Sequence, residues 1–162
     1  MATSTDKIQS LRKVEGIRTA LKQQGRKVAF TNGCFDLLHA GHVHLFRKAK
    51  ELGDVLIVAI NDDRSIRMIK GARRPIFPLE ERLEILAAIE YIDYLVPFPE
   101  KTPQKIISIL LPDVLVKGAD WRMDEVVGRE EVEETGGKVV RVPLQKGLST
   151  TSLLERILNS AE

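Results

Sequence analysis

This 162-residue chain has a single cysteine, no long apolar run and only a small excess of positive charge. The single cysteine, Cys34, excludes an internal disulfide and fits a reducing compartment. No stretch reaches the roughly 18 apolar residues that a membrane-spanning helix needs. The polar stretch 1–9 lacks the apolar core of a signal peptide. We therefore expect a cytoplasmic protein with no membrane partner.

The charge balance excludes another class of partner. The chain carries 25 Lys and Arg against 23 Asp and Glu, a formal net charge of +2. This excess is too small to predict nucleic-acid binding, and no basic run or basic-aromatic alternation supports it. Linkers, repeats and low-complexity tracts are also lacking. We therefore expect one domain over residues 1–162, with an N-terminal helical extension (1–25) before a core (26–162).

Short runs rich in β-branched residues predict the strands of a parallel sheet. They cover residues 28–30, 55–60, 92–96, 114–116 and 139–142. Continuous apolar runs suit strands that are covered on both faces. Because helical patterns alternate with these runs, the chain is predicted to be a single-domain Rossmann-like α/β fold. Its doubly wound parallel sheet would have about five strands and helices on both faces.

The helical patterns vary in how clearly they begin and end. They cover residues 8–21 and 42–52, then 79–89, a helix opened by Thr102-Pro103, and a last helix that a Ser152–Glu155 capping box would begin. Residues 64–77 predict a mobile basic loop instead. The apolar stripe of the first helix (6–24) is a candidate contact in a homo-oligomer.

The segment from Thr31 to His42 carries the chemistry. It begins where the first strand ends and runs into a helix, which is where ligands bind in doubly wound sheets. Gly33 allows the backbone to approach a phosphate closely, and the helix N-terminus favours negative charge. His39 and His42 are spaced to lie on one helix face, and Gly41 removes a side chain that would block a nucleotide.

Two histidines at this place suit nucleotidyl transfer. Attack on the α-phosphorus of a nucleoside triphosphate builds negative charge on the α-phosphate oxygens. Imidazole N–H donors stabilise that charge more in the transition state than in the ground state. A phosphate nucleophile is already anionic and needs no general base, so positioning and charge stabilisation suffice.

With its His39-Ala40-Gly41-His42 string, the sequence resembles the HxGH nucleotidyltransferases, which include cytidylyltransferases and coenzyme-pathway adenylyltransferases. Within that family it is most similar to the heptose 1-phosphate adenylyltransferases. The resemblance runs from about Lys27 to Leu158. Besides the turn 31–36, it includes the segments 59–63, 74–76, 81–82, 112–120 and 148–151.

The resemblance implies ATP and D-glycero-β-D-manno-heptose 1-phosphate as partners, with ADP-heptose and pyrophosphate as products. Mg²⁺ would enter bound to the substrate, since the carboxylates form no metal cage by spacing. The enzymes of this family are often oligomeric, which suggests a homo-oligomer. At 162 residues the chain has no room for a sugar kinase, so a separate heptose kinase would supply the acceptor.

The resemblance also assigns roles by position. The catalytic residues would be His39, His42 and Lys70. Nucleotide would contact the first turn, the end of the fourth strand and the start of the last helix, that is Asn32, Gly33, Cys34, Phe35, Gly41, Gly118, Ala119, Asp120, Ser149, Thr150 and Thr151. Asp36 and Arg82 would serve the substrate phosphate. No residue is assigned to a dedicated metal site.

Several alternatives stay open from the sequence. Lys70 and Arg82 could face solvent, the hydroxyls of 149–151 could simply cap a helix, and Trp121 could border the pocket or cover the core. Lys146 stands near the place where glycerol-phosphate cytidylyltransferases carry an arginine. The substrates could be CTP or GTP with another phosphorylated acceptor. A non-catalytic nucleotide sensor and a thiol hydrolase using Cys34 are alternatives of other classes.

Overall fold

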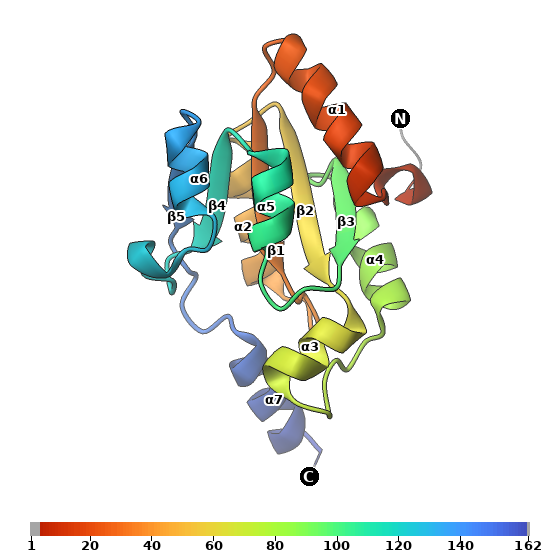
Figure 1. Ribbon diagram of the computed structural model, residues 1–162. Coiled ribbons are helices and arrows are strands. Elements are labelled where there is room, and N and C mark those ends of the chain that lie inside the picture. The colour runs from red at the N-terminus through yellow and green to blue at the C-terminus, as the bar shows by residue number, and fades with distance from the viewer. Residues whose placement is uncertain (1–3, 162) are drawn as a thin grey trace.

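A computed structural model describes residues 4–161 of the chain. Its centre is one parallel sheet of five strands in the order β3-β2-β1-β4-β5 (Figure 1). The strands are β1 (Val28–Gly33), β2 (Val55–Asn61), β3 (Tyr94–Phe98), β4 (Val114–Gly118) and β5 (Lys138–Val142). The predicted fold class is confirmed, and each predicted strand overlaps an observed one. The first three residues of the polar N-terminal stretch, and Glu162, lie outside the described residues.

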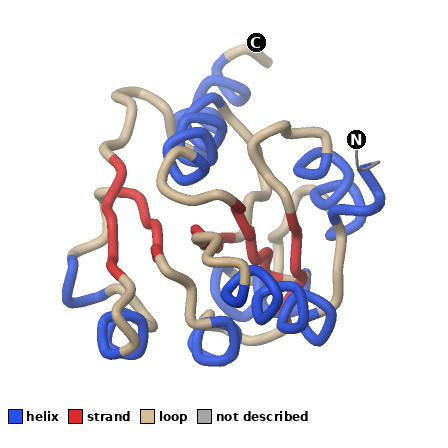
Figure 2. The backbone as a smooth tube through the Cα atoms, turned by 90° about the horizontal axis from the view of Figure 1, so that it is seen from above, coloured by secondary structure: helices blue, strands red, loops and turns tan. Residues whose placement is uncertain are grey.

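Helices cover both faces of the sheet, and Figure 2 shows the strands between them. One core packs α1, α5 and α6 against one face, and a second core packs α2 and α4 against the other. The helical elements are η1 (Ser4–Lys7), α1 (Leu11–Gln23), α2 (Ala40–Lys50), α3 (Asp63–Lys70), α4 (Leu79–Ala87), α5 (Gln104–Leu110), η2 (Met123–Glu125), α6 (Arg129–Glu134) and α7 (Thr150–Asn159).

Three sequence-based expectations need correction. The segment 64–77 is not a continuous loop, because α3 occupies its first half and is capped by Asp62, whose carboxylate accepts from the Ser65 N–H. The last helix begins with Ser149 as its N-cap, three residues before the expected Ser152. The apolar stripe of α1 is also not free for an oligomer contact, because Val14 and Leu21 are buried in the core.

The strand order places a switch point between β1 and β4. The chain leaves β1 toward β2 and β3, then crosses to the other side of β1 to form β4 and β5. Loops that follow β1 and β4 therefore diverge and leave a crevice beyond the carboxyl ends of these strands. Both α3 and α7 lie at this end of the sheet (Figure 1). No helix among residues 4–161 is long and apolar enough to cross a membrane.

Candidate active site

A pocket of about 330 Å³ lies at the switch point. Its walls come from the β1–α2 turn, the starts of α2 and α7, the end of α3 and the segments that follow β4 and β5. Most residues expected at the site line it, namely Asn32, Gly33, Cys34, Phe35, Asp36, His39, Gly41, His42, Lys70, Gly118, Asp120, Ser149 and Thr150. The pocket does not include Arg82, Ala119 or Thr151.

The turn after β1 is built around Phe35. Its φ of 46° lies in the left-handed region that side chains other than glycine rarely adopt. Burial of the ring offsets this strain, since it packs 5.1 Å from Phe46 and edge-on to His42 at 5.5 Å, centroid to centroid. A Cβ at Gly33 would lie 2.9 Å from the Phe35 ring, so this turn requires glycine there.

The two imidazoles are held by the backbone at the start of α2. The Gly41 N–H donates to His39 Nδ1 at 3.1 Å, and the His39 N–H donates to His42 Nδ1 at 3.3 Å. The rings stack with centroids 3.9 Å apart. Because each Nδ1 accepts a hydrogen bond, the proton of each neutral imidazole resides on Nε2. Each ring therefore keeps Nε2–H as its donor for a ligand.

Both histidines are neutral near pH 7. Burial, with smaller effects of His39 and Lys70, lowers the pKa of His42 to about 4. Burial also lowers the pKa of His39. Neutral rings can donate through Nε2–H without a permanent buried charge, and an arriving anion favours their protonated form. The pair is therefore suited to stabilise charge that develops on a bound phosphate.

Gly41 lines the pocket and also leaves room for the His39 ring. A Cβ at this position would lie 2.8 Å from Cε1 and 2.9 Å from Nδ1 of His39, and 3.3 Å from Cβ of Leu148. The His39 ring therefore gives a second physical reason for glycine here, beside the expected clearance for a nucleotide. Glycine here leaves room for the imidazole that caps its own helix.

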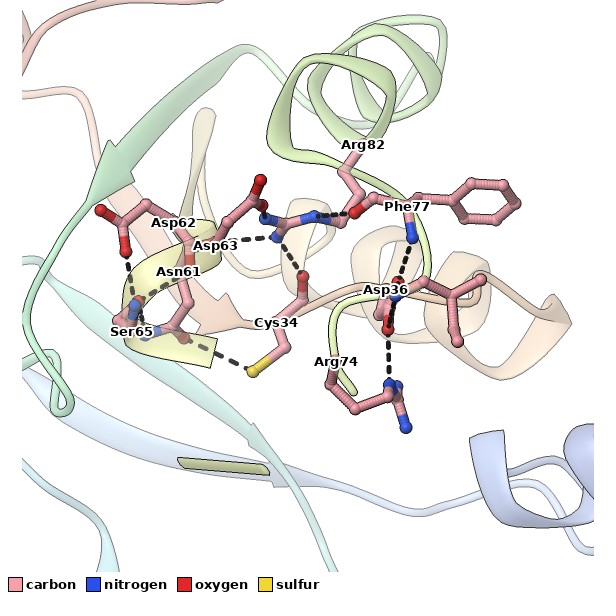
Figure 3. A network of polar contacts seen from close by, with 10 residues as sticks. Cys34, Asp36, Asn61, Asp62, Asp63, Ser65, Arg74, Phe77 and Arg82 are labelled. Carbon is pink, nitrogen blue, oxygen red and sulfur yellow. Dashed lines mark hydrogen bonds and ion pairs between the residues drawn. The ribbon is translucent and has the colours of Figure 1, made fainter. Parts of the chain in front are cut away.

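The carboxylate of Asp36 is occupied by hydrogen bonds from the protein and does not serve a substrate. Its carboxylate accepts from Arg74 Nε at 2.7 Å and from the N–H groups of Ile76 and Phe77 (Figure 3). Although burial raises the pKa of Asp36, these hydrogen bonds and the Arg74 charge lower it overall. An anion so placed would repel a phosphate, so the expected substrate contact is replaced by anchoring of the loop after α3.

Arg82 is buried in a network of polar contacts, and Figure 3 shows these partners around its guanidinium. Its side chain is 0% exposed and forms an ion pair with Asp63 at 2.7 Å. It also donates to three carbonyl oxygens, those of Cys34, Asn61 and Phe77. The guanidinium thereby ties the β1–α2 turn to the end of β2 and to the loop before α4. Its expected substrate role is corrected to a structural one, because the side chain is fully buried, is bonded to protein atoms and does not line the pocket.

The end of β4 supplies a residue that sequence reasoning missed. Lys117 lines the pocket, is 7% exposed, and has its ammonium 5.2 Å from the centroid of the Trp121 ring. The signal that could have revealed it is a lysine directly after the apolar run of β4. Trp121 borders the pocket, which settles that alternative. The Asp120 carboxylate lies close over Gly118, since a Cβ there would be 2.5 Å from Asp120 Oδ1.

Two of the expected nucleotide contacts fall outside the pocket. Ala119 donates its N–H to the Val142 carbonyl at 2.8 Å, so this donor is used between adjacent strand ends. Thr151 is exposed in the first turn of α7. Ser149 both caps α7, accepting from the Ser152 N–H at 3.0 Å, and lines the pocket beside Thr150. The capping role of Ser149 is therefore confirmed, and its place at the pocket leaves phosphate binding as a prediction.

Neither a metal cage nor an activated thiol is evident in the site. No group of three or more His, Cys, Asp or Glu within residues 4–161 is arranged to hold a metal ion. Asp120 is the pocket carboxylate with no hydrogen bond in the described part of the chain. Burial raises the pKa of Cys34, although Lys70, Arg82 and Arg74 oppose it. A raised pKa disfavours the thiolate that a hydrolase would need.

This arrangement of fold and site is that of a nucleotidyltransferase: a doubly wound sheet with two helix-capping imidazoles at its switch point. A family model described as cytidylyltransferase-like matches residues 30–156. The chain belongs to the cytidylyltransferase-like family.

Relatives and solved structures agree with this assignment. The bifunctional protein HldE of Geobacter sulfurreducens is 51% identical over 154 residues, covering 95% of this chain and 31% of that protein. HldE of Coxiella burnetii is 49% identical over 138 residues, covering 85% of this chain and 29% of that protein. The chain thus spans about a third of the length of these relatives.

Among solved structures, a lipopolysaccharide core biosynthesis protein of Thermoplasma volcanium aligns with a TM-score of 0.61 and 30% identity, covering 75% of this chain and 98% of that one. The pantoate-beta-alanine ligase of Francisella tularensis aligns with a TM-score of 0.65 and 20% identity, covering 92% and 72%. The second likeness shows the fold alone.

Replacing Arg82 tests the network that holds the turn. We expect Arg82→Met to lower the free energy of unfolding by about 3 kcal/mol, because it leaves carbonyls and Asp63 without their buried partner. Arg129→Met, which removes an exposed pair with Glu133, should cost about 0.5 kcal/mol or less. Denaturant unfolding measures both. Equal losses for the two variants would show that the Arg82 network does not carry this stability.

The lowered pKa of His42 predicts a pH-dependent stability. Unfolded chains bind the proton near pH 6.5 and the folded protein only near pH 4. The unfolded state therefore takes up the proton first as pH falls, and stability decreases between pH 6.5 and 4, by up to about 3 kcal/mol. The decrease should be smaller in His42→Asn when both proteins are unfolded in denaturant across this range. Identical pH profiles would contradict it.

Proposed function

We propose that this protein joins ATP and D-glycero-β-D-manno-heptose 1-phosphate, giving ADP-heptose and pyrophosphate for lipopolysaccharide or related glycan precursors. The observation that carries the proposal is the pair of neutral imidazoles, each with Nδ1 bonded to the backbone and Nε2–H left for a phosphate. The similarity to HldE proteins, and to a lipopolysaccharide core biosynthesis protein, supports the heptose acceptor.

In the proposed reaction, a phosphate oxygen of the sugar 1-phosphate attacks the α-phosphorus of ATP. The new P–O bond forms as the bond from the α-phosphorus to the β-phosphate oxygen breaks, and pyrophosphate leaves with that electron pair. His39 and His42 donate to the α-phosphate oxygens, where negative charge grows. The nucleophile is already ionised, so no general base is needed. Removal of one such donor costs roughly 100- to 1000-fold in rate.

Other pocket residues would bind the phosphates, the base and the ribose. The β1–α2 turn, held by Arg82, presents backbone to the phosphates. Ser149, Thr150 and the unpaired N–H groups that begin α7 suit the β- and γ-phosphates. Lys70, exposed at the end of α3, would meet phosphate from the rim of the pocket. Gly118 and Asp120 would border the base and ribose. We assign this catalytic core to residues 26–162 and the extension to 1–25.

Mg²⁺ fits this site as an ion that enters bound to the phosphates of the nucleotide. The donor set offers one carboxylate without a hydrogen bond in the described chain, Asp120, and Mg²⁺ commonly uses one or two carboxylates with substrate phosphates. When bound it would neutralise charge on the triphosphate. The proposed setting is the cytoplasm, with a heptose kinase supplying the acceptor and a homo-oligomer as the assembly.

Pyrophosphate release tests the proposal directly. Purified protein with Mg²⁺ is given ATP, CTP or GTP, each with and without D-glycero-β-D-manno-heptose 1-phosphate. We expect release with ATP and the heptose phosphate together. Release with CTP or GTP instead would retain the class of enzyme and replace the substrates. Nucleotide binding without any release would favour the sensor alternative.

The role of His42 is tested by replacement. We expect His42→Ala to lower kcat by at least roughly 100-fold while the nucleotide still binds, because a charge-stabilising donor is lost. Lys48→Ala, on the exposed side of the same helix, serves as the matched control. Thermal melting of both variants separates loss of chemistry from loss of fold. Near-normal turnover by a folded His42→Ala protein would refute the assigned role.

A further inference from the structure

Lys117 is a buried cation without an anionic partner. Its side chain leaves β4 at the floor of the pocket and is 7% exposed. Among the described residues, no hydrogen-bond acceptor or carboxylate lies within bonding distance of its ammonium. Its nearest companion is the face of Trp121, 5.2 Å from Nζ to the ring centroid. A cation–π contact alone replaces only part of the hydration that burial removes.

This arrangement is costly for the protein alone. Burial lowers the pKa of Lys117 to about 8, even though Asp120 and Cys34 act to raise it. A lysine that is largely buried and has no paired anion is destabilising, so proteins rarely keep one without a use. The missing element is an anion at the pocket floor, and phosphate is the anion that the proposed reaction brings there.

Two polar atoms of the same pocket lack a hydrogen-bond partner. The Thr31 hydroxyl and the Asn32 side-chain oxygen, both on β1, are buried without a hydrogen-bond partner. Thr31 is 0% exposed, and both residues line the same pocket. Buried polar groups in proteins are nearly always bonded, so their coincidence with an unpaired ammonium marks a place built for a polar ligand.

We propose that Lys117 binds a phosphate group of one of the two substrates, with the Thr31 hydroxyl as a neighbouring donor. This inference rests on the proposed function and deepens it, since the substrate phosphate would supply the missing counter-charge. The phosphate can belong to the nucleotide or to the phosphorylated acceptor, and the two are separated by binding measurements. Lys117 is thus a substrate-binding residue in addition to the histidine pair.

A purely structural role makes the opposite prediction for the free protein. If the ammonium stabilised the fold, Lys117→Met would melt at a lower temperature. A lysine kept for a ligand costs stability, and methionine fills the same space without charge, so the variant should melt at the same temperature or higher. This comparison uses no substrate and does not depend on activity.

Calorimetric titration locates the phosphate. We expect Lys117→Met to weaken either α,β-methylene-ATP with Mg²⁺ or the heptose 1-phosphate by roughly 10- to 100-fold, the range for a charge-assisted hydrogen bond. Lys117→Arg should recover part of the loss. Lys138→Met, at the exposed start of β5, is the matched control and should bind both as the wild type does. Adenosine, which has no phosphate, should bind the wild type and Lys117→Met alike.

A pH series adds an independent readout. The charged groups facing Lys117 are Asp120 and Cys34, with His42 and Lys70 across the pocket and Arg141 beside Trp121. Because Lys117 loses its proton near pH 8, affinity for the phosphate it binds should fall roughly tenfold from pH 7.5 to 9. Lys117→Met should lack this fall.

The two proposals fail separately. Absence of pyrophosphate release by the wild type would overturn the heptose reaction and leave Lys117 to be judged by α,β-methylene-ATP and inorganic phosphate. If Lys117→Met binds every phosphate probe within twofold of the wild type, the role of Lys117 is overturned. A large drop in the melting temperature of the ligand-free variant would overturn it as well.

Discussion

Two hydrogen bonds from the backbone of the first turn of α2 determine what the histidines can do. Each donates to an imidazole Nδ1, so each neutral ring carries its proton on Nε2. The same bonds satisfy N–H groups that a helix start otherwise leaves without partners. The hydrogen bond to each Nδ1 therefore both caps the helix and fixes the proton of that imidazole on Nε2. A histidine that caps its helix is already oriented, so less side-chain entropy is lost when phosphate arrives.

The surrounding structure preserves this geometry. Gly41 leaves room for the His39 ring. The buried Phe35 ring packs edge-on against His42, although the Phe35 backbone is in the left-handed region. Arg82 donates to a carbonyl oxygen of the β1–α2 turn, and the Asp36 carboxylate accepts from the loop that follows Lys70. Both contacts hold the backbone in place. None of these side chains needs to touch a substrate. They hold the backbone from which phosphate-binding groups project, as preorganised electrostatic stabilisation requires.

Local patterns predicted the fold and the place of the site, because strand periodicity and a strand–turn–helix at the first crossover are encoded in contiguous residues. Partnerships over long sequence distances were not predicted. Arg82 was expected to face phosphate or solvent, since sequence does not show that carbonyls of Cys34 and Asn61 converge on it. Likewise, α3 was missed because its short, charged pattern resembles a loop. Lys117 was visible as a polar residue in an apolar strand, yet its lack of a partner is a property of the folded pocket.

The central claim is that two neutral imidazoles present Nε2–H to a phosphate. Nitrogen-15 NMR of the imidazoles in the ligand-free protein measures it directly, because chemical shifts distinguish the two tautomers and the protonated ring. Our account predicts the Nε2–H tautomer for His39 and His42 at pH 7, with His42 titrating at about pH 4. Observation of Nδ1–H tautomers, or of imidazolium at neutral pH, would contradict it.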